Sequence, residues 1–174
     1  QNLNYSESVT LNTVTVATII TTILMPIMGS LSDKVGRKPL YIWGSILMML
    51  YAFPYFWLIH QNSVAMLVIA TIIGLGIIWA PITAVLGTMF SEIFSAKVRY
   101  TGISLGYQIG AAAAGGTAPL IATALLIRFD GSYVPVALYI MLTSAISLVA
   151  VLAVTDRRNQ ELDEEIEETK IANN

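Results

Sequence analysis

Long apolar stretches separated by short polar segments run along most of the chain. Five stretches contain no Asp, Glu, Lys or Arg, and they cover about 9–31, 39–59, 64–89, 101–127 and 133–154. A helix needs roughly 20 apolar residues to cross a hydrocarbon layer about 30 Å thick. The alternating pattern of barrel strands is absent, and backbone groups in lipid have to be satisfied internally. The pattern therefore predicts an all-α, polytopic helical membrane protein with five transmembrane helices.

The composition excludes several classes of function. Hydrophobic residues make up 56% and charged residues 11% of the 174 residues, whereas soluble domains carry about 25% charged residues. The chain has no Cys and a single His, His60, which excludes disulfides and Cys- or His-rich metal sites. The net charge of −2 offers no basic face for nucleic acid. We find no catalytic constellation and no phosphate-binding glycine loop, so we expect no enzyme, no metal and no cofactor.

The distribution of basic residues predicts the orientation in the membrane. Cytoplasmic loops carry an excess of Lys and Arg. Only Arg128 lies on one side of the predicted spans, and the other side has Lys34, Arg37, Lys38, Lys97, Arg99, Arg157 and Arg158. We therefore expect the loops at 32–38 and 90–100 and the C-terminus to lie in the cytoplasm, and Gln1 to lie outside. The acidic segment 156–174 is expected to be a solvated cytoplasmic tail, with a regulatory docking role as the alternative.

An odd number of helices, an external start and the lack of an initiator Met fit the later part of a longer chain. We expect that a preceding helix ended just before Gln1.

The loop between the first two spans carries the sharpest local motif, GSLSDKVGRKP at 29–39. Gly29 would let the end of the first helix approach a neighbour closely. Gly36 permits a reversal of the backbone, and Pro39 suits the first turn of the next helix. A generic basic loop would explain the Lys and Arg residues, but not Asp33 with two glycines at fixed offsets.

This loop resembles the signature G-x-x-x-D-[RK]-x-G-R-[RK] of the major facilitator superfamily, with Lys34 where Arg is more usual and with Lys38 as its last residue. The segments SEIF (91–94), RYTGISLGYQ (99–108) and GGTAPL (115–120) further resemble the metabolite:proton symporters of that superfamily. The resemblance implies a major-facilitator fold in which the five helices correspond to the eighth to twelfth of twelve. They would form an incomplete C-terminal six-helix half, whose partner is the missing N-terminal half.

The resemblance also implies a cytoplasmic gate. Its members would be Asp33 and Arg37 in the motif, Glu92 after the third span and Arg99 before the fourth. Opposite charges attract more strongly at a partly desolvated helix junction than in water. The alternative is that these are solvated interface charges worth under about 1 kcal/mol each.

The fourth span has two distinct faces. Gly102, Gly106 and Gly110 fall within about 80° of one another at 100° per residue, which predicts a packing stripe of small residues. Gln108 lies opposite that stripe, well inside the span. A polar side chain at this depth needs a partner, so we expect either a substrate contact or a hydrogen bond between helices.

Other cavity candidates have weaker signals. Trp79 is central in the third span and would be a cavity wall or a core filler, and Tyr107 is similar. Asn12 and the threonines of the first span, Thr15, Thr18 and Thr22, would line an outer vestibule. We expect the second and fifth spans to face lipid, because strongly polar residues are absent from their interiors.

The resemblance thus implies proton-coupled symport of a small metabolite, such as an organic acid or a zwitterionic osmolyte, by alternating access across a bacterial inner membrane. The partners would be the substrate, protons and the lipid bilayer. The alternative is a non-transporting membrane scaffold or a half-transporter subunit.

Overall fold

The computed structural model describes residues 5–93 and 99–153, without the side chains of residues 92, 93 and 99. The acidic segment 156–174 lies outside the described residues. Within them, five helices are long and apolar enough to cross a membrane: Glu7–Val35, Arg37–Ile59, Val64–Ser91, Tyr100–Arg128 and Val134–Ala153. No strand occurs in the described part, so the predicted all-α class with five long apolar helices is confirmed.

Three of these helices are regular and two contain wider turns. The regular helices are α1 (Glu7–Val35), α2 (Arg37–Ile59) and α7 (Val134–Ala153). The third span consists of α3 (Val64–Thr71), the π-helix η1 (Ile72–Ile78) and α4 (Trp79–Ile93). The fourth span consists of α5 (Arg99–Gly110), the π-helix η2 (Ala111–Gly115) and α6 (Gly116–Arg128). The π-helical segments were not foreseen from the sequence.

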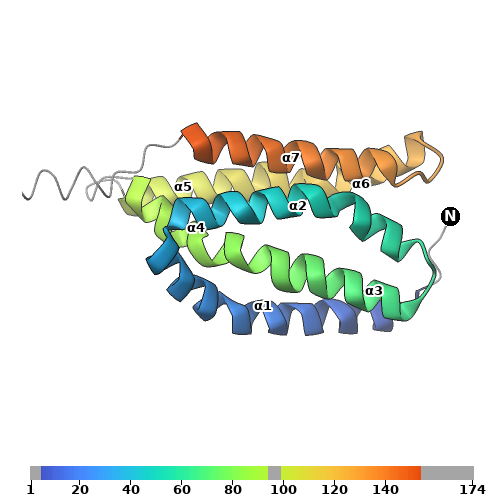
Figure 1. Cartoon of the computed structure of the whole chain (residues 1–174). Coiled ribbons are helices and arrows are strands. Elements are labelled where there is room, and N and C mark those ends of the chain that lie inside the picture. Colours follow the sequence, from blue (N-terminus) through green and yellow to red (C-terminus); the bar gives the residue numbers. More distant parts are fainter. Residues whose placement is uncertain (1–4, 94–98, 154–174) are drawn as a thin grey trace, which may run out of the picture.

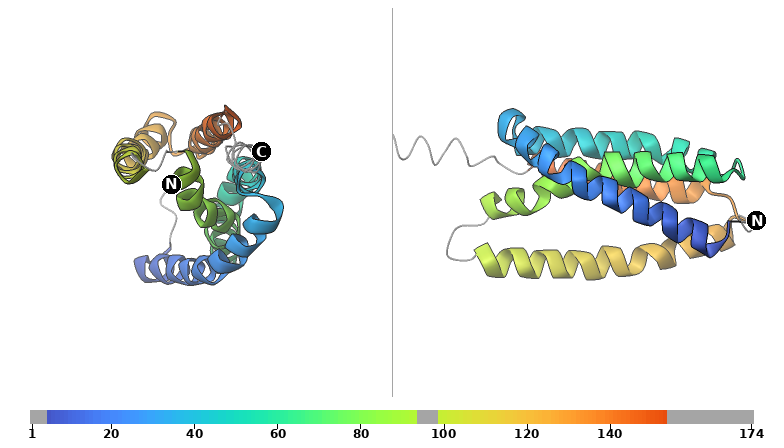
Figure 2. Two further views of the ribbon diagram at one scale, coloured as in Figure 1. Left: turned by 90° about the vertical axis from the view of Figure 1, so that its left-hand side faces the viewer. Right: turned by 90° about the horizontal axis from the view of Figure 1, so that it is seen from below.

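The helices form an elongated bundle (Figure 1). α1 packs against η1 and α4, and α2 lies between α7 on one side and α3 and α4 on the other. α6 contacts α7, and Figure 2 shows α5 and α6 on the α7 side of the bundle, away from α1. The fourth span therefore has the weakest contacts with the rest of the chain, and none of the residues in its apolar window is buried.

The end of the bundle that holds the 60–63 and 129–133 turns is closed by side-chain contacts. Ser6 caps α1 by accepting a hydrogen bond from the Val9 N–H. The Tyr5 hydroxyl donates to the Ile59 carbonyl over 2.8 Å. The ring of His60 lies 4.4 Å from that of Tyr133, between centroids. These contacts join the start of α1, the end of α2 and the start of α7.

The main core lies toward the opposite end, where α2, α4 and α7 meet. Its buried members are Leu40, Tyr41, Ile82, Val85, Met89 and Val151. α2 and α4 cross closely here because position 44 is glycine: a Cβ at Gly44 would lie 2.7 Å from Cγ1 of Ile82. Small residues allow helices in membranes to approach until their backbones are in van der Waals contact.

This crossing yields a prediction for stability. Gly44→Ala should destabilise the full-length protein by about 1–3 kcal/mol, because Ile82 or a helix backbone has to shift. Gly87→Ala is the matched control on α4, since a Cβ there would meet no heavy atom within 4 Å. Thermal unfolding in detergent measures the effect.

The double mutant Gly44→Ala with Ile82→Ala separates the clash from a general effect of the substitution. Adding Gly44→Ala to Ile82→Ala should cost less than adding it to the wild type. Equal costs in the two backgrounds would contradict the assigned contact.

Candidate functional site

Within the motif loop, a single residue connects the first two helices. α1 continues to Val35 and α2 begins at Arg37, so only Gly36 lies outside a helix. Gly36 has φ 102°, a backbone conformation that disfavours side chains with a Cβ, and its N–H donates to the Ser32 carbonyl over 2.8 Å. Pro39 lies in the first turn of α2, where its missing N–H costs nothing. The loop expected at 32–38 is thus mostly helical, and the reversal falls on the glycine for which it was predicted.

Asp33 and Arg37 face each other across this turn. The Arg37 guanidinium lies 3.8 Å from the Asp33 carboxylate. The Asp33 side chain is 70% exposed and that of Arg37 is 29% exposed. Asp33 occupies the last turn of α1, where the helix dipole disfavours a carboxylate, so the cation offsets an unfavourable position.

Lys38 extends the motif toward the last helix. Its Nζ donates to the Leu152 carbonyl, in the last turn of α7, over 3.2 Å. Carbonyls at the end of a helix lack partners within the helix, and a cation there is favoured by the dipole. The motif loop therefore contacts α7 directly, which the sequence did not indicate.

The structure describes only some of the remaining motif and gate residues in full. Lys34 is an exposed residue in the last turn of α1. The close helix approach expected at Gly29 is not formed, because a Cβ there would meet no heavy atom within 4 Å among the described residues. Glu92 and Arg99 belong to the ends of α4 and α5, but their side chains lie outside the described residues.

A cavity of about 580 Å³, partly open to the surface, lies between the helices and is bordered by all five spans. Most of its wall is apolar, and hydroxyl groups supply the polar part. The lining residues are Val14 of α1; Met48, Tyr51, Ala52 and Tyr55 of α2; Thr71, Gly74, Leu75 and Trp79 of the third span; Ala114, Gly115 and Ala118 of the fourth; and Tyr139, Ile140, Thr143 and Ser144 of α7.

Both π-helical segments border this cavity. A π-turn changes the i→i−4 pattern of the helix and is frequent at functional sites. The Leu75 carbonyl of η1 accepts a hydrogen bond from the Thr21 hydroxyl of α1 over 2.7 Å. Gly76 lies against α1, where a Cβ would be 3.5 Å from the Ala17 carbonyl, and Gly74 lies against the Tyr51 ring of α2. η1 is thereby held between two helices.

Sequence reasoning missed the tyrosines of the cavity. The Tyr51 hydroxyl donates to the Ala70 carbonyl over 3.2 Å, and the Tyr55 side chain interacts with that of Thr71. Tyr41, Ser45, Met48, Ala52 and Tyr55 recur at helical spacing on one face of α2. That spacing was the signal that could have identified this face.

The second and fifth spans, which were expected to face lipid, also border the cavity. One face of α2 and one of α7 line the cavity and contact each other, whereas the opposite faces carry exposed apolar residues such as Leu47, Leu50, Leu142 and Ile146. The expectation considered only strongly polar side chains. The hydroxyls of tyrosine, threonine and serine are sufficient to form a polar face on each of these two helices.

Of the four predicted cavity residues, only Trp79 borders this cavity. Tyr107 and Gln108 are exposed on α5, and Asn12 is exposed on α1. The Gln108 amide makes no hydrogen bond within the described part of the chain. The predicted packing stripe also makes no close contact here, since Cβ atoms at Gly106 and Gly110 would meet nothing within 4 Å.

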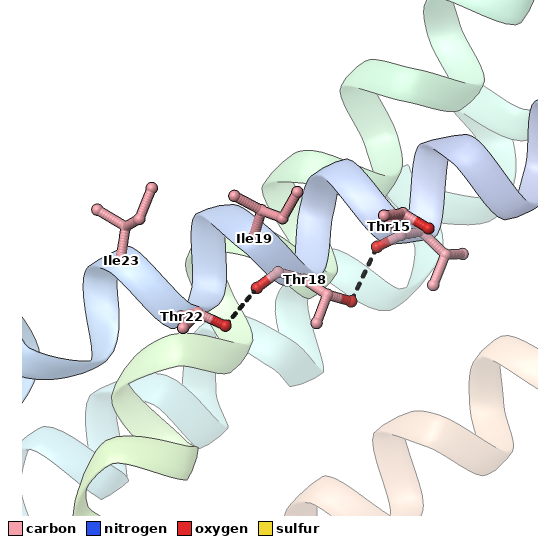
Figure 3. A pocket seen from close by; sticks show the side chains of 6 residues that line it. Thr15, Thr18, Ile19, Thr22 and Ile23 are labelled. Atoms are coloured by element: carbon pink, nitrogen blue, oxygen red, sulfur yellow. Dashed lines mark hydrogen bonds between the residues drawn. The ribbon is translucent and has the colours of Figure 1, made fainter.

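The threonines of α1 form a separate shallow surface (Figure 3). Val14, Thr15, Thr18, Ile19, Thr22 and Ile23 line it, all from this one helix. Each threonine hydroxyl donates to the carbonyl four residues earlier, over 2.8–2.9 Å. Because the hydroxyls are used within the helix, this face presents mainly methyl groups.

The central cavity has a defined chemical character. Among the described residues, no group of three His, Asp or Glu side chains could hold a metal ion. The cavity can contact a small solute through hydroxyls and apolar groups, and none of its lining residues is charged.

Comparison with known proteins places the chain in a family. Residues 1–172 match the model of the Major Facilitator Superfamily. The shikimate transporter of Escherichia coli K12 is 31% identical over 156 residues, which cover 90% of this chain and 36% of that protein. The proline/betaine transporter of Salmonella typhimurium is 30% identical over 161 residues, which cover 92% of this chain and 32% of that protein. The ectoine/proline transporter of Corynebacterium glutamicum is 31% identical over 147 residues, which cover 83% of this chain and 28% of that protein.

The chain thus spans about a third of the length of these relatives. No solved structure matches it. The family model nonetheless covers almost all of the chain, and the motif loop and the five apolar helices agree with it. The protein is an integral membrane protein that belongs to the Major Facilitator Superfamily.

Proposed function

We propose that this chain is part of a proton-coupled symporter that carries a small metabolite by alternating access. The match of residues 1–172 to the family model carries the proposal. The relatives named above are transporters of shikimate, proline, betaine or ectoine, which are small organic acids or zwitterions. A cavity bordered by all five spans supports the same function, because solute sites of transporters lie at membrane depth between helices.

The rest of the transporter would cover the faces that these helices leave exposed. The apolar threonine face of α1 is exposed, and α5 and α6 have few contacts with the other helices within the described residues. We assign a further half of the protein, with six helices, to this side of the bundle. Its contacts would bury the small-residue stripe of α5.

Gln108 is a proposed substrate contact on this reasoning. Its amide lies in an apolar span, is exposed and makes no hydrogen bond in the described part of the chain. An unpaired amide facing hydrocarbon costs several kcal/mol, roughly 4–8 on a cyclohexane scale. A water-filled solute pathway between the two halves would remove that cost, and Tyr107 would lie beside it.

Uptake of labelled organic acids and zwitterionic osmolytes by cells with the full-length protein tests the function. An inward proton gradient should drive uptake, and its collapse should abolish it. Gln108→Ala should lower uptake severalfold at normal expression, and substrate should protect a Cys at 108 from thiol reagents. Ile109→Ala, on an exposed neighbour, is the control. Loss of expression together with uptake, and no protection, would make Gln108 structural.

The orientation has its own prediction. We assign the motif loop to the cytoplasm, because Lys34, Arg37 and Lys38 all lie at that end of the bundle. A Cys at Lys34 should react only with membrane-permeant reagents in intact cells, and a Cys at Gln61, in the opposite turn, should also react with impermeant ones. Both positions are exposed, whereas Ser32 is 97% buried and unsuitable as a probe. Labelling of position 34 from outside would reverse the orientation.

Asp33 and Arg37 are proposed members of a gate, with Glu92 and Arg99 as further members. The Asp33 member of the pair is largely exposed and the charged atoms are 3.8 Å apart, so the pair by itself contributes under about 1 kcal/mol. A larger effect requires that closure of the two halves desolvates it. Losing one partner would then strand the other charge.

Asp33→Asn should therefore expose Cys probes in the cytoplasmic cavity more often and should slow uptake, with substrate affinity changing less. About 1.4 kcal/mol is sufficient to change the ratio of two conformations tenfold. Lys34→Gln is the control, because it also removes a charge from the last turn of α1. Similar probe accessibility and uptake in wild type, Asp33→Asn and Arg99→Gln would exclude the gate.

A further inference from the structure

A second cavity, of about 180 Å³, adjoins the first toward the motif-loop end of the bundle. It lies among α2, α4 and α7. Its lining residues are Tyr41, Ser45, Met48, Trp79, Ile82, Thr143, Ser144 and Ser147. Four of these residues, Met48, Trp79, Thr143 and Ser144, also border the larger cavity, so the two spaces share a wall.

Ser45 is the residue that needs an explanation. Its side chain is 97% buried, and its hydroxyl makes no hydrogen bond within the described part of the chain. Serine in a membrane helix usually donates to a carbonyl of its own helix. Among the described residues, no fully enclosed side-chain polar atom is without a partner, so the Ser45 hydroxyl is in contact with the cavity. Its partner has to come from inside that space.

Water fits this space in size and in bonding. A water molecule takes about 30 Å³ of liquid volume and needs two to four polar partners. Ser45 and Ser144 offer hydroxyls without partners among the described residues. Thr143, which donates to the Ile140 carbonyl over 2.9 Å, can still accept. A short row of water molecules could therefore be hydrogen-bonded along α7.

The end of the row is closed by one interhelical hydrogen bond. The Tyr41 hydroxyl lies 2.8 Å from Oγ of Ser147. Beyond this pair, the buried side chains of Leu40, Met89 and Val151 separate the cavity from the motif-loop end of the bundle. Parting of α2 and α7 at Tyr41 and Ser147 would free two further hydroxyls and open that end.

We propose that the smaller cavity is filled with water and conducts protons between the larger cavity and the motif-loop end of the bundle. The apolar stretches 9–31, 39–59, 64–89, 101–127 and 133–154 contain no Asp, Glu, Lys, Arg or His, so a proton crossing this region moves along water and hydroxyls. A hydronium ion on one side gives a proton to the hydroxyl and becomes water. The hydroxyl releases its own proton to a water molecule on the other side, which becomes hydronium. At the hydroxyl one O–H bond forms and one breaks, so the hydroxyl ends neutral. The proposal rests on the proposed proton-coupled function.

Hydration is tested by thiol labelling of the full-length protein in membrane vesicles, in a background without other cysteines. Ser45→Cys and Ser144→Cys should react with a small methanethiosulfonate at least about tenfold faster than Leu47→Cys and Ile146→Cys, because the reactive thiolate forms only where water reaches. The two controls lie at similar depths, on faces that are exposed in this chain. Equal rates at all four positions, or reaction at the controls alone, would overturn the hydrated cavity.

Proton conduction is tested by a matched pair of variants. Ser45→Thr and Ser45→Val have the same shape, but only threonine keeps a hydroxyl. Proton-driven net uptake should be severalfold slower in Ser45→Val than in Ser45→Thr. Exchange of internal for external substrate should be equal in the two, because exchange needs no net movement of protons. Equal net uptake in both variants, or an equal loss of exchange and net uptake in Ser45→Val, would overturn conduction.

The two proposals fail in different ways. If the unmodified protein shows no proton-driven uptake, the proposed function fails. The labelling contrast between the cavity and control positions remains a separate measure of hydration. If uptake is proton-driven and the labelling contrast is missing, only the conducting cavity is rejected.

Discussion

In the hydrocarbon part of a membrane, every backbone N–H and C=O group has to find a partner within the protein. This constraint explains why the described residues are almost entirely helical and why the π-helical turn η1 lies between neighbouring helices. The Leu75 carbonyl in η1 accepts from Thr21 of α1. The Ala70 carbonyl accepts from Tyr51 of α2. Side chains of neighbouring helices thus satisfy backbone groups at the point where the third span changes its winding.

The same constraint links glycine to the cavity. Gly74 and Gly76 allow α2 and α1 to approach η1 from two sides, so the third span is fixed where it borders the cavity. The fourth span has the opposite character, since Cβ atoms at Gly106 and Gly110 would meet nothing within 4 Å among the described residues and η2 contains no buried residue. One wall of the cavity is therefore rigidly packed, and the facing wall is supported by few contacts. This difference agrees with the proposed alternating access, in which the fourth span would follow the movement of a second half.

The sequence was sufficient to predict the number of helices and the turn at Gly36. Membrane-spanning helices are recognised by their long apolar stretches, and a backbone with positive φ is recognised by a glycine. The sequence was insufficient for the π-turns, since IIGLGII is compatible with an ordinary helix. The cavity faces of α2 and α7 were missed because Tyr51, Tyr139 and Thr143 are only weakly polar one by one. Their importance arises from their common face and from the approach of two helices distant in sequence. The placement of Gln108 depends on parts of the transporter beyond this chain, so neither the pattern nor the fold of these five helices could determine it.

The charges of this half are concentrated at the ends of its helices, and this separation has a consequence for mechanism. The motif residues Asp33, Arg37 and Lys38 join α1, α2 and the end of α7, whereas the cavities are lined by uncharged residues: hydroxyl side chains, the Trp79 indole and apolar groups. An uncharged and mostly apolar wall offers no opposite charge to a carboxylate or an ammonium group, so removing such a group from water there is costly. Charged recognition of an acid or a zwitterion, and any carboxylate that takes up the coupled proton, would then belong to the other half. The half described here would contribute the solute's apolar surroundings and the closure at the motif-loop end. A wall without charged side chains also favours neither conformation strongly. No charged side chain of this wall has to leave water when the cavity closes on one side of the membrane and opens on the other.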